Sequence, residues 1–153
     1  MTRMRLGIAT EERSPVSIAT TNSQILGYTT LRLALGMSLF IHGVDRFVMF
    51  RQFADKTAKM FADSWLPRFT VMGFVYTVPP VELLIGIFVL LGLFTRTGLV
   101  LGGLWMVVLI FGSSLIEQFD VVGIQLIYSL IFSALLYYHD ANRISIDHWL
   151  GRI

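Results

Sequence analysis

The sequence predicts an all-α integral membrane protein: an antiparallel four-helix bundle with an amphipathic interfacial helix between the first and second spans. Composition is the first observation, since 55% of the residues are hydrophobic and only 14% are charged. The mean hydropathy of +0.70 is far from that of an average soluble domain. The second is a set of long apolar segments that can cross a hydrocarbon core about 30 Å thick. Because backbone groups in lipid must bond internally and no barrel pattern is present, these segments should be helices.

The N-terminal segment, residues 1–24, is polar and rich in Thr, Ser and Arg. It has no apolar core of signal-peptide length, so we expect a flexible extramembrane tail. The first span follows at residues 25–44 and is apolar apart from Arg32 and His42. The chain has 153 residues, which is enough for one bundle rather than two domains.

The connection at residues 45–69 has the spacing of a helix rather than of a plain loop. Apolar residues recur on one side and charged residues fall on the other. We expect this amphipathic helix to lie on the membrane surface; the alternatives are packing on a partner protein or over the mouth of the bundle. The first face carries Phe50, Phe53, Thr57, Met60, Phe61 and Ser64 or Trp65, and the second carries Arg51, Asp55, Lys56, Lys59 and Asp63.

The second span, residues 70–92, holds Glu82 near its middle, just after Pro79 and Pro80. The prolines cannot donate backbone hydrogen bonds, and Pro80 pushes its predecessor out of the helical region. We therefore predict a break near Val78, with Glu82 in the first turn of a restarted helix, where the dipole favours an anion. A carboxylate at such a break is a functional-site candidate. The alternative is that Glu82 only caps the restarted helix and pairs with a neighbouring cation.

The third span, residues 97–116, carries no charge, and the fourth, residues 121–138, has an aromatic end suited to a membrane interface. The short connection at residues 93–96 predicts that the second and third spans form a tight antiparallel pair. We expect residues 139–153 to form an interfacial segment.

Glycines are spaced for close helix contact. Gly36 and Gly43 lie a heptad apart in the first span, and Gly98 and Gly102 form a small-xxx-small pair in the third. The alternative is that membrane helices simply tolerate glycine, so the spacing by itself predicts packing and no chemistry.

One end of the predicted bundle gathers many polar side chains. Antiparallel connectivity brings the end of the first span, the end of the third and the start of the fourth to the same membrane face, and helical side chains tilt Glu82 towards it. Such a mouth can bind a polar head group, a quinone carbonyl or a proton; the alternative is a charge-paired lid that satisfies helix ends. The candidate ligand-binding residues are Glu82, His42, Arg46, Glu117, Gln118 and Gln125, with Asp45 and Asp120 beside them.

Arg32 lies towards the opposite membrane face. A lone arginine there can snorkel to the lipid head groups. The alternative is a structural ion pair with Glu82, whose predicted depth differs by about one turn. Such a pair would lock the first two spans together.

Several chemistries lack the residues they need. The chain has no cysteine, which excludes disulfides, iron–sulfur clusters, thiolate catalysis and covalently held haem within this polypeptide. His42 lies at the opposite membrane face from His139 and His148, so no histidine pair suits haem, and no histidine spacing suits zinc. The net charge of +2 argues against a nucleic-acid partner. We expect no metal site and no catalytic residues that can be assigned in the isolated chain.

Four spans place both termini on the same side of the membrane. Lys and Arg are slightly more numerous on that side, and cytoplasmic loops carry the excess. We therefore expect a bacterial cytoplasmic membrane with the termini in the cytoplasm. The terminal side carries Arg3, Arg5, Arg13, Arg96, Arg143 and Arg152, and the other side carries Arg46, Arg51, Lys56, Lys59 and Arg68.

Two segments resemble the DoxX-like family of four-helix membrane proteins. Residues 31–47 read Leu-Arg-Leu-Ala-Leu-Gly-Met-Ser-Leu-Phe-Ile-His-Gly-Val-Asp-Arg-Phe. Residues 80–96 read Pro-Val-Glu-Leu-Leu-Ile-Gly-Ile-Phe-Val-Leu-Leu-Gly-Leu-Phe-Thr-Arg and are the more specific. The resemblance extends over residues 27–138. The motif positions that it carries over are Arg32, His42, Gly43, Glu82, Gly86 and Arg96.

The resemblance implies a membrane subunit of a quinone-linked redox or respiratory system, because the related DoxD branch is a subunit of thiosulfate:quinone oxidoreductase. A catalytic partner would then carry the metal or thiol chemistry, and the expected ligand is a quinone held without a covalent bond. The expected partners are the lipid bilayer and a larger membrane complex or a homo-oligomer. The alternatives are a structural or assembly subunit of such a complex, or an oligomeric small-solute transporter, which the predicted break in the second span suggests.

Overall fold

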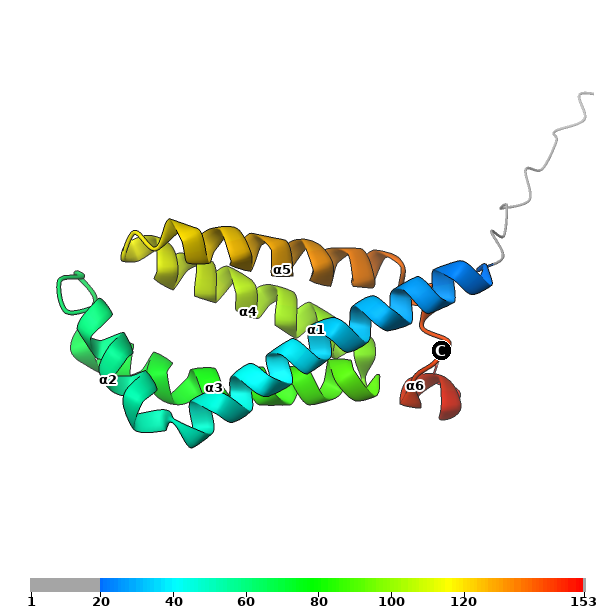
Figure 1. Ribbon diagram of the computed structural model, residues 1–153, viewed down its shortest axis with the longest axis horizontal. Helices are drawn as coiled ribbons and strands as arrows, with labels where there is room; N and C mark the ends of the chain where they lie inside the picture. Colours follow the sequence, from blue (N-terminus) through cyan, green and yellow to red (C-terminus); the bar gives the residue numbers. More distant parts are fainter. Residues whose placement is uncertain (1–19, 153) are drawn as a thin grey trace, which may run out of the picture.

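The computed structural model describes residues 20–152, and this part of the chain is helical without strands (Figure 1). Four long helices alternate in direction, and a short helix separates the first two, which confirms the predicted all-α bundle. The elements are α1 (Asn22–Val48), α2 (Phe50–Met60), α3 (Arg68–Leu91), α4 (Thr95–Leu115), α5 (Phe119–Tyr137), a 3-10 helix η1 (His139–Ala141) and α6 (Ile146–Trp149).

The helices α1, α3, α4 and α5 are each long and apolar enough to cross a membrane. Their bounds differ most from the predicted spans at α1, which begins inside the predicted tail. A capping box sets this start: the Gln24 N–H donates to Thr21 Oγ1 at 3.3 Å, and the Thr21 N–H donates to Gln24 Oε1 at 2.8 Å. Two backbone donors are thereby satisfied. Residues 1–19 of the predicted tail lie outside the described residues.

The predicted break in the second span is wrong. Helix α3 runs from Arg68 to Leu91 with Pro79 and Pro80 inside it. The prolines remove two backbone donors, but dividing the helix would leave more backbone groups without partners, and lipid offers none. Glu82 therefore lies inside a continuous helix, beyond the first turn in which the helix dipole acts.

Glycines bring α1 and α3 into close contact. A Cβ atom on Gly36 would lie 2.5 Å from the backbone nitrogen of Leu90, and one on Gly86 would lie 2.5 Å from the backbone nitrogen of Phe40. One on Gly43 would lie 2.6 Å from the α3 backbone. Only glycine permits this helix separation. The predicted packing role of Gly36 and Gly43 is confirmed, and Gly86 belongs to the same contact.

The helices α4 and α5 form the second pair. A Cβ atom on Gly102 would clash with the buried Phe132 ring of α5. Gly98 faces α3 instead, where a Cβ atom would lie 3.1 Å from Cβ of Phe88. The predicted glycine pair thus serves two neighbouring helices. The core that joins both pairs contains Tyr28, Leu35, Leu39, Ile85, Val89, Leu99, Met106, Phe132 and Leu135.

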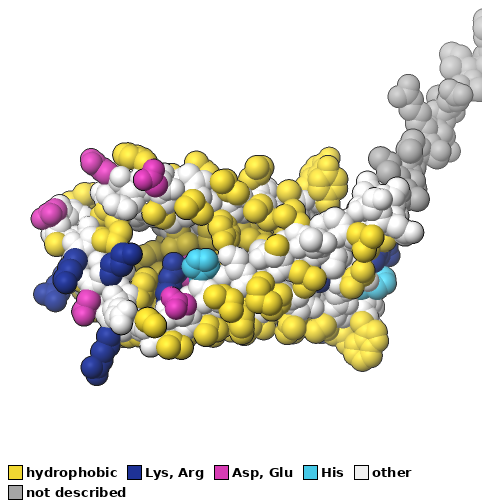
Figure 2. All heavy atoms as spheres, in the orientation of Figure 1, with side chains coloured by type: hydrophobic (Ala, Val, Ile, Leu, Met, Phe, Trp, Pro, Cys, Tyr) yellow, Lys and Arg dark blue, Asp and Glu magenta, His cyan; other side chains and the backbone are white. Residues whose placement is uncertain are grey.

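Helix α2 lies at the end of the bundle where α4 turns into α5 (Figure 1). Side chains of Lys, Arg, Asp and Glu gather at this end, whereas hydrophobic side chains cover the long side of the molecule (Figure 2). Thr57 of α2 and Phe61, the residue that follows the helix, are buried, so this face of the helix packs inward. The predicted amphipathic helix between the first two spans is confirmed. It covers the bundle mouth, as one of the alternatives has it, and its position on the membrane surface stays a prediction.

The C-terminal segment packs on the turn between α3 and α4. Gly92 and Phe94 in this turn have φ angles of 65° and 48°, and the second is uncommon for a residue other than glycine. The Asp147 carboxylate accepts hydrogen bonds from the Phe94 N–H at 2.9 Å, the Thr95 N–H at 2.6 Å and the Thr95 hydroxyl at 2.8 Å. It therefore caps the start of α4. The interfacial position of residues 139–153 stays a prediction.

The surroundings of Asp147 favour its charged form. Burial opposes ionisation of the carboxyl, but the hydrogen bonds from Thr95 and Phe94 and the charge of Arg152 outweigh it. Together they hold the pKa of Asp147 below its ordinary value of 3.8. The ionised carboxylate therefore stabilises this end of the bundle.

Replacing Gly86 by alanine should destabilise the protein, because the new methyl group meets the α1 backbone at Phe40. Overpacking costs about 1–3 kcal/mol, so we expect a lower Tm for the purified protein in detergent, followed by circular dichroism. Gly73→Ala is the matched control in the same helix, since a Cβ atom there meets nothing within 4 Å. That control should keep or raise the Tm. A wild-type Tm for Gly86→Ala would contradict the close contact.

Asp147→Ala should lower the Tm at neutral pH, because the loss of a helix cap costs about 0.5–2 kcal/mol. Folding lowers the pKa of Asp147, so its contribution is complete above the ordinary aspartate pKa and is lost as the pH falls through the lowered value. The Tm difference between wild type and variant should therefore shrink in strongly acidic solution. Asp140→Ala, at an exposed position of η1, should leave the Tm unchanged. A difference for Asp147→Ala that stays constant down to low pH would rule out this role.

Candidate functional site

Glu82 and Arg46 form an ion pair inside the bundle. Glu82 is only 3% exposed in α3, and Arg46 reaches it from the last turn of α1. An unpaired carboxylate at this depth would be costly, so the close approach of α1 to α3 is what permits the charge. The Arg46 guanidinium carbon also lies 5.3 Å from the centre of the Phe53 ring of α2. This cation–π contact ties α2 to the same group.

The predicted ion pair between Arg32 and Glu82 is wrong, and so is the prediction that Arg32 snorkels. Arg32 is 2% exposed. Its Nη1 donates to the carbonyl oxygens of Val89 at 2.6 Å and Leu90 at 2.9 Å, and its Nη2 donates to that of Ile144 at 2.8 Å. The last carbonyls of a helix lack partners and carry partial negative charge. Arg32 therefore caps the end of α3 and fastens the C-terminal segment to it.

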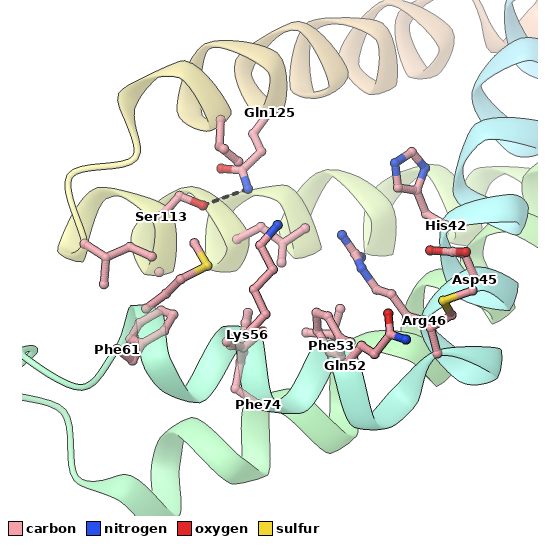
Figure 3. A pocket seen from close by; sticks show the side chains of 18 residues that line it. His42, Asp45, Arg46, Gln52, Phe53, Lys56, Phe61, Phe74, Ser113 and Gln125 are labelled. Atoms are coloured by element: carbon pink, nitrogen blue, oxygen red, sulfur yellow. Dashed lines mark hydrogen bonds between the residues drawn. The ribbon is translucent and has the colours of Figure 1, made fainter.

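A cavity of about 430 Å³ lies between α2 and the neighbouring ends of α1, α3, α4 and α5 (Figure 3). This volume is typical of a small-molecule site. A hollow is visible between α5 and α1 on the same face of the molecule, with basic and histidine side chains at its edge (Figure 2). The polar lining includes His42, Asp45, Arg46, Lys56, Ser113 and Gln125, and the apolar lining includes Phe53, Phe61, Phe74, Val78 and Leu109.

A smaller cavity of about 210 Å³ adjoins the first and extends deeper between α1 and α5. The two cavities share His42, Arg46 and Gln125 among their lining residues. Glu82 and Tyr128 line only the smaller one. The buried acid therefore lies at the inner end of the hollow and not in its main chamber.

Hydrogen bonds within the protein fix the polar side chains of the cavities. His42 Nδ1 lies 2.7 Å from the Ser38 carbonyl oxygen, and because a carbonyl can only accept, Nδ1 carries the proton of this bond. The Ser38 hydroxyl is hydrogen-bonded to the Tyr128 hydroxyl. Gln125 Nε2 donates to Ser113 Oγ at 2.9 Å, as Figure 3 shows. The site is therefore organised before any ligand arrives.

The structure brings together four of the six predicted ligand-binding residues. His42, Arg46 and Gln125 line both cavities, and Glu82 lines the smaller one. Glu117 and Gln118 line neither cavity; both are exposed in the turn between α4 and α5. The reason is the turn itself, in which Glu117 has a φ of 56° and the chain reverses outside the mouth.

Sequence reasoning missed several residues of the site. Phe53 and Lys56 belong to the predicted amphipathic helix, whose pattern locates the helix but does not indicate the cavity that both side chains line. Ser113 and Tyr128 are weakly polar residues inside apolar spans. Tyr128 follows Gln125 by one helical turn, so the two share a face, and this spacing is the signal that would have found it.

Charges of both signs surround the cavities. Arg46 and Lys56 are positive, and Asp45 and Glu82 are negative. This balance suits an uncharged head group better than an anion. Across residues 20–152, no group of three or more His, Asp or Glu side chains is placed to hold a metal ion.

A family model described as DoxX matches residues 27–114. The match covers more than half of the chain and includes both motif segments. It ends inside α4, so it is shorter than the expected resemblance over residues 27–138. No match was found among curated proteins or among solved structures.

Removing one partner of the Arg46–Glu82 pair should destabilise the protein strongly. Arg46→Met leaves a buried carboxylate unpaired, which typically costs about 3–5 kcal/mol. The double variant with Glu82→Leu should recover much of this loss, because neither charge then remains. The measurement is the Tm of each single variant and of the double variant in detergent. Arg51→Met, at an exposed position of α2, controls for the loss of a positive charge, and effects that simply add would show that the two groups do not interact.

Proposed function

This chain belongs to the DoxX family, and from that premise we propose that it is a membrane subunit of a quinone-linked redox system that holds a quinone head group in the cavity under α2. One observation carries the proposal. It is an organised cavity of about 430 Å³ with apolar walls and a few fixed polar groups, inside a bundle whose long helices can cross a membrane.

The chemistry of the lining supports an aromatic, uncharged ligand. A quinone head group is a flat ring that carries oxygens at opposite ends. The rings of Phe53, Phe61 and Phe74 offer apolar surface for its faces, and Arg46 and Gln125 offer hydrogen-bonding groups. Binding sites for small molecules commonly combine these features, and the balanced charges favour a neutral molecule.

The position of the hollow supports a ligand that arrives from the lipid. The smaller cavity lies between α1 and α5 and is lined by Leu39, Val121 and Ile124 besides its polar groups. The surrounding long side of the molecule is hydrophobic (Figure 2). A lipid-soluble molecule can enter here sideways without crossing water.

We place the electron-transfer groups in a partner subunit. The chain has no cysteine and thus no residue for thiol or iron–sulfur chemistry. The proposed role of this subunit is to bind the quinone and to position it at the membrane.

A structural or assembly subunit is the second candidate. Large hydrophobic side chains of α4 and α5 are exposed, and they fit the helices of a larger complex as well as they fit lipid. Examples are Leu104, Val107, Ile127 and Leu130. The transporter alternative loses its support, because α3 is not broken.

Gly112→Leu should weaken the binding of a short-chain ubiquinone analogue to the full-length protein by at least ~tenfold, since 1.4 kcal/mol corresponds to that factor. Gly112 lines the main cavity, and a Cβ atom there would meet only the Phe61 and Phe74 rings, at 3.6 and 4.0 Å. The Cβ atom of a leucine is therefore placed without a backbone clash, and we expect the rest of the side chain to take up space in the chamber. Titration calorimetry in detergent measures the affinity.

Gly123→Leu is the matched control, because Gly123 is exposed on α5 and a Cβ atom there meets nothing within 4 Å. It should bind the analogue as wild type does. Wild-type affinity in Gly112→Leu would place the ligand elsewhere. A wild-type protein that binds no analogue, and that co-purifies with a stoichiometric large partner, would favour the assembly role instead.

A further inference from the structure

Another cavity lies beside α2, where this helix, the connection at residues 61–67 and the start of α3 meet. It has a volume of about 490 Å³, and we call it the loop cavity. Phe61 lines both the loop cavity and the cavity under α2. From its charge, its apolar lining and its place on the bundle, we propose that the loop cavity binds an anionic phospholipid. The inference goes beyond the proposed function and does not depend on it.

Two cations line the loop cavity. Lys59 belongs to the last turn of α2, and Arg68 is the first residue of α3. Both residues are exposed, and within residues 20–152 neither forms an ion pair with a carboxylate. Ammonium and guanidinium groups are common ligands of phosphate. Both groups are therefore available to a phosphate that enters between the two helices.

Asp55 also lines the loop cavity and opposes the binding of a phosphate. It lies four residues before Lys59 in α2 and is exposed. Two positive charges and one negative charge leave the lining with a net positive charge. This lining favours an anion over a neutral molecule, whereas the charges around the cavities at the bundle mouth are balanced. A lipid with a singly charged head group complements the loop cavity.

The rest of the lining is apolar, which favours a lipid over a free phosphate ion. Phe61 and Val71 are buried, and Leu66 and Met72 lie beside them around the cavity. A hydrated phosphate ion gains no contact from these side chains. The glycerol backbone and the upper acyl chains of a phospholipid can pack against them while the phosphate stays at the cations.

The loop cavity lies where lipid head groups are expected. Helix α3 is long and apolar enough to cross a membrane, and Arg68 is at its first residue. Trp65 and Phe69, on either side of Arg68 and Pro67, are 73% and 79% exposed, and exposed aromatic residues are typical of the membrane–water interface. Charged side chains gather at this end, and hydrophobic side chains cover the long side of the molecule (Figure 2). A bilayer lipid would therefore present its phosphate at the level of the two cations.

The test titrates the full-length protein in detergent with phosphatidylglycerol or with phosphatidylcholine of identical acyl chains, followed by native mass spectrometry. Both lipids carry the phosphate, but choline adds a positive charge that the two cations repel. We expect the first phosphatidylglycerol to bind at least about fivefold more tightly than the first phosphatidylcholine, since one charge near a membrane surface is worth about this factor. Inorganic phosphate at the same concentration should not displace the lipid, because it cannot use the apolar lining.

Lys59→Met and Arg68→Met should each weaken the binding of phosphatidylglycerol by about fivefold. Asp55→Asn should strengthen it, because a like charge is removed. Arg51→Met is the matched control, since it removes a positive charge from an exposed position of α2 that does not line the loop cavity. It should bind the lipid as wild type does. All four substitutions are at exposed positions, and an unchanged Tm checks that each variant folds.

Three results would overturn the inference. Equal affinities of wild type for the two lipids would show that the head group is not selected. Displacement of the lipid by an equal concentration of inorganic phosphate would show an anion site without a lipid. Equal losses of affinity in Arg51→Met, Lys59→Met and Arg68→Met would show a general effect of charge and no binding in the loop cavity. None of these results bears on the quinone site, whose test uses a different ligand and a different variant.

Discussion

The close contact between α1 and α3 is the constraint on which the rest of the structure depends. Glycines on both helices let the backbones approach until no Cβ atom would fit between them. At this separation Arg46 reaches Glu82 near one end, and Arg32 reaches the last carbonyls of α3 at the other. Without the contact each of these groups would be charged and unpaired in an apolar interior, at a cost of about several kcal/mol per ion. Arg32 also fastens the C-terminal segment to one end of the bundle. The cavity lies at the other end, under α2.

The fold could be predicted from the sequence because the hydropathy of a segment indicates whether that segment can lie in the lipid bilayer. Segments of the right length and polarity have no alternative to the helix in lipid, and four of them in a short chain leave little choice of topology. The same rule explains the failure at Pro79 and Pro80. A local preference against helix at these residues competed with the need to satisfy every other backbone group of α3, and the second requirement prevailed. The amphipathic pattern of α2 likewise located the helix, but a pattern shows that a face is apolar and not what that face contacts.

The site was predictable only in part, for reasons that differ from residue to residue. His42, Arg46 and Gln125 were found because they interrupt apolar spans near one membrane face. The partner of Glu82 was misassigned because the depths of the residues were misjudged: both arginines of α1 face α3, but Arg32 lies level with the last carbonyls of α3, whereas Arg46 lies level with Glu82. The orientation of Gln125 depends on its hydrogen bond to Ser113, a contact between two helices that one-dimensional spacing cannot show.

The paired charges and the uncharged polar side chains serve different purposes in this site. Glu82 is the most conspicuous residue of the sequence, yet Arg46 already satisfies it, so its charge contributes mainly to where the helices lie. Discrimination between ligands must come from atoms that the protein leaves unsatisfied, because only these change partners when a ligand binds. Gln125 and His42 each use one polar atom to hold the side chain in place, through hydrogen bonds to the Ser113 hydroxyl and the Ser38 carbonyl. Recognition in this bundle can therefore change through uncharged side chains while the ion pair that fixes α1 against α3 stays intact.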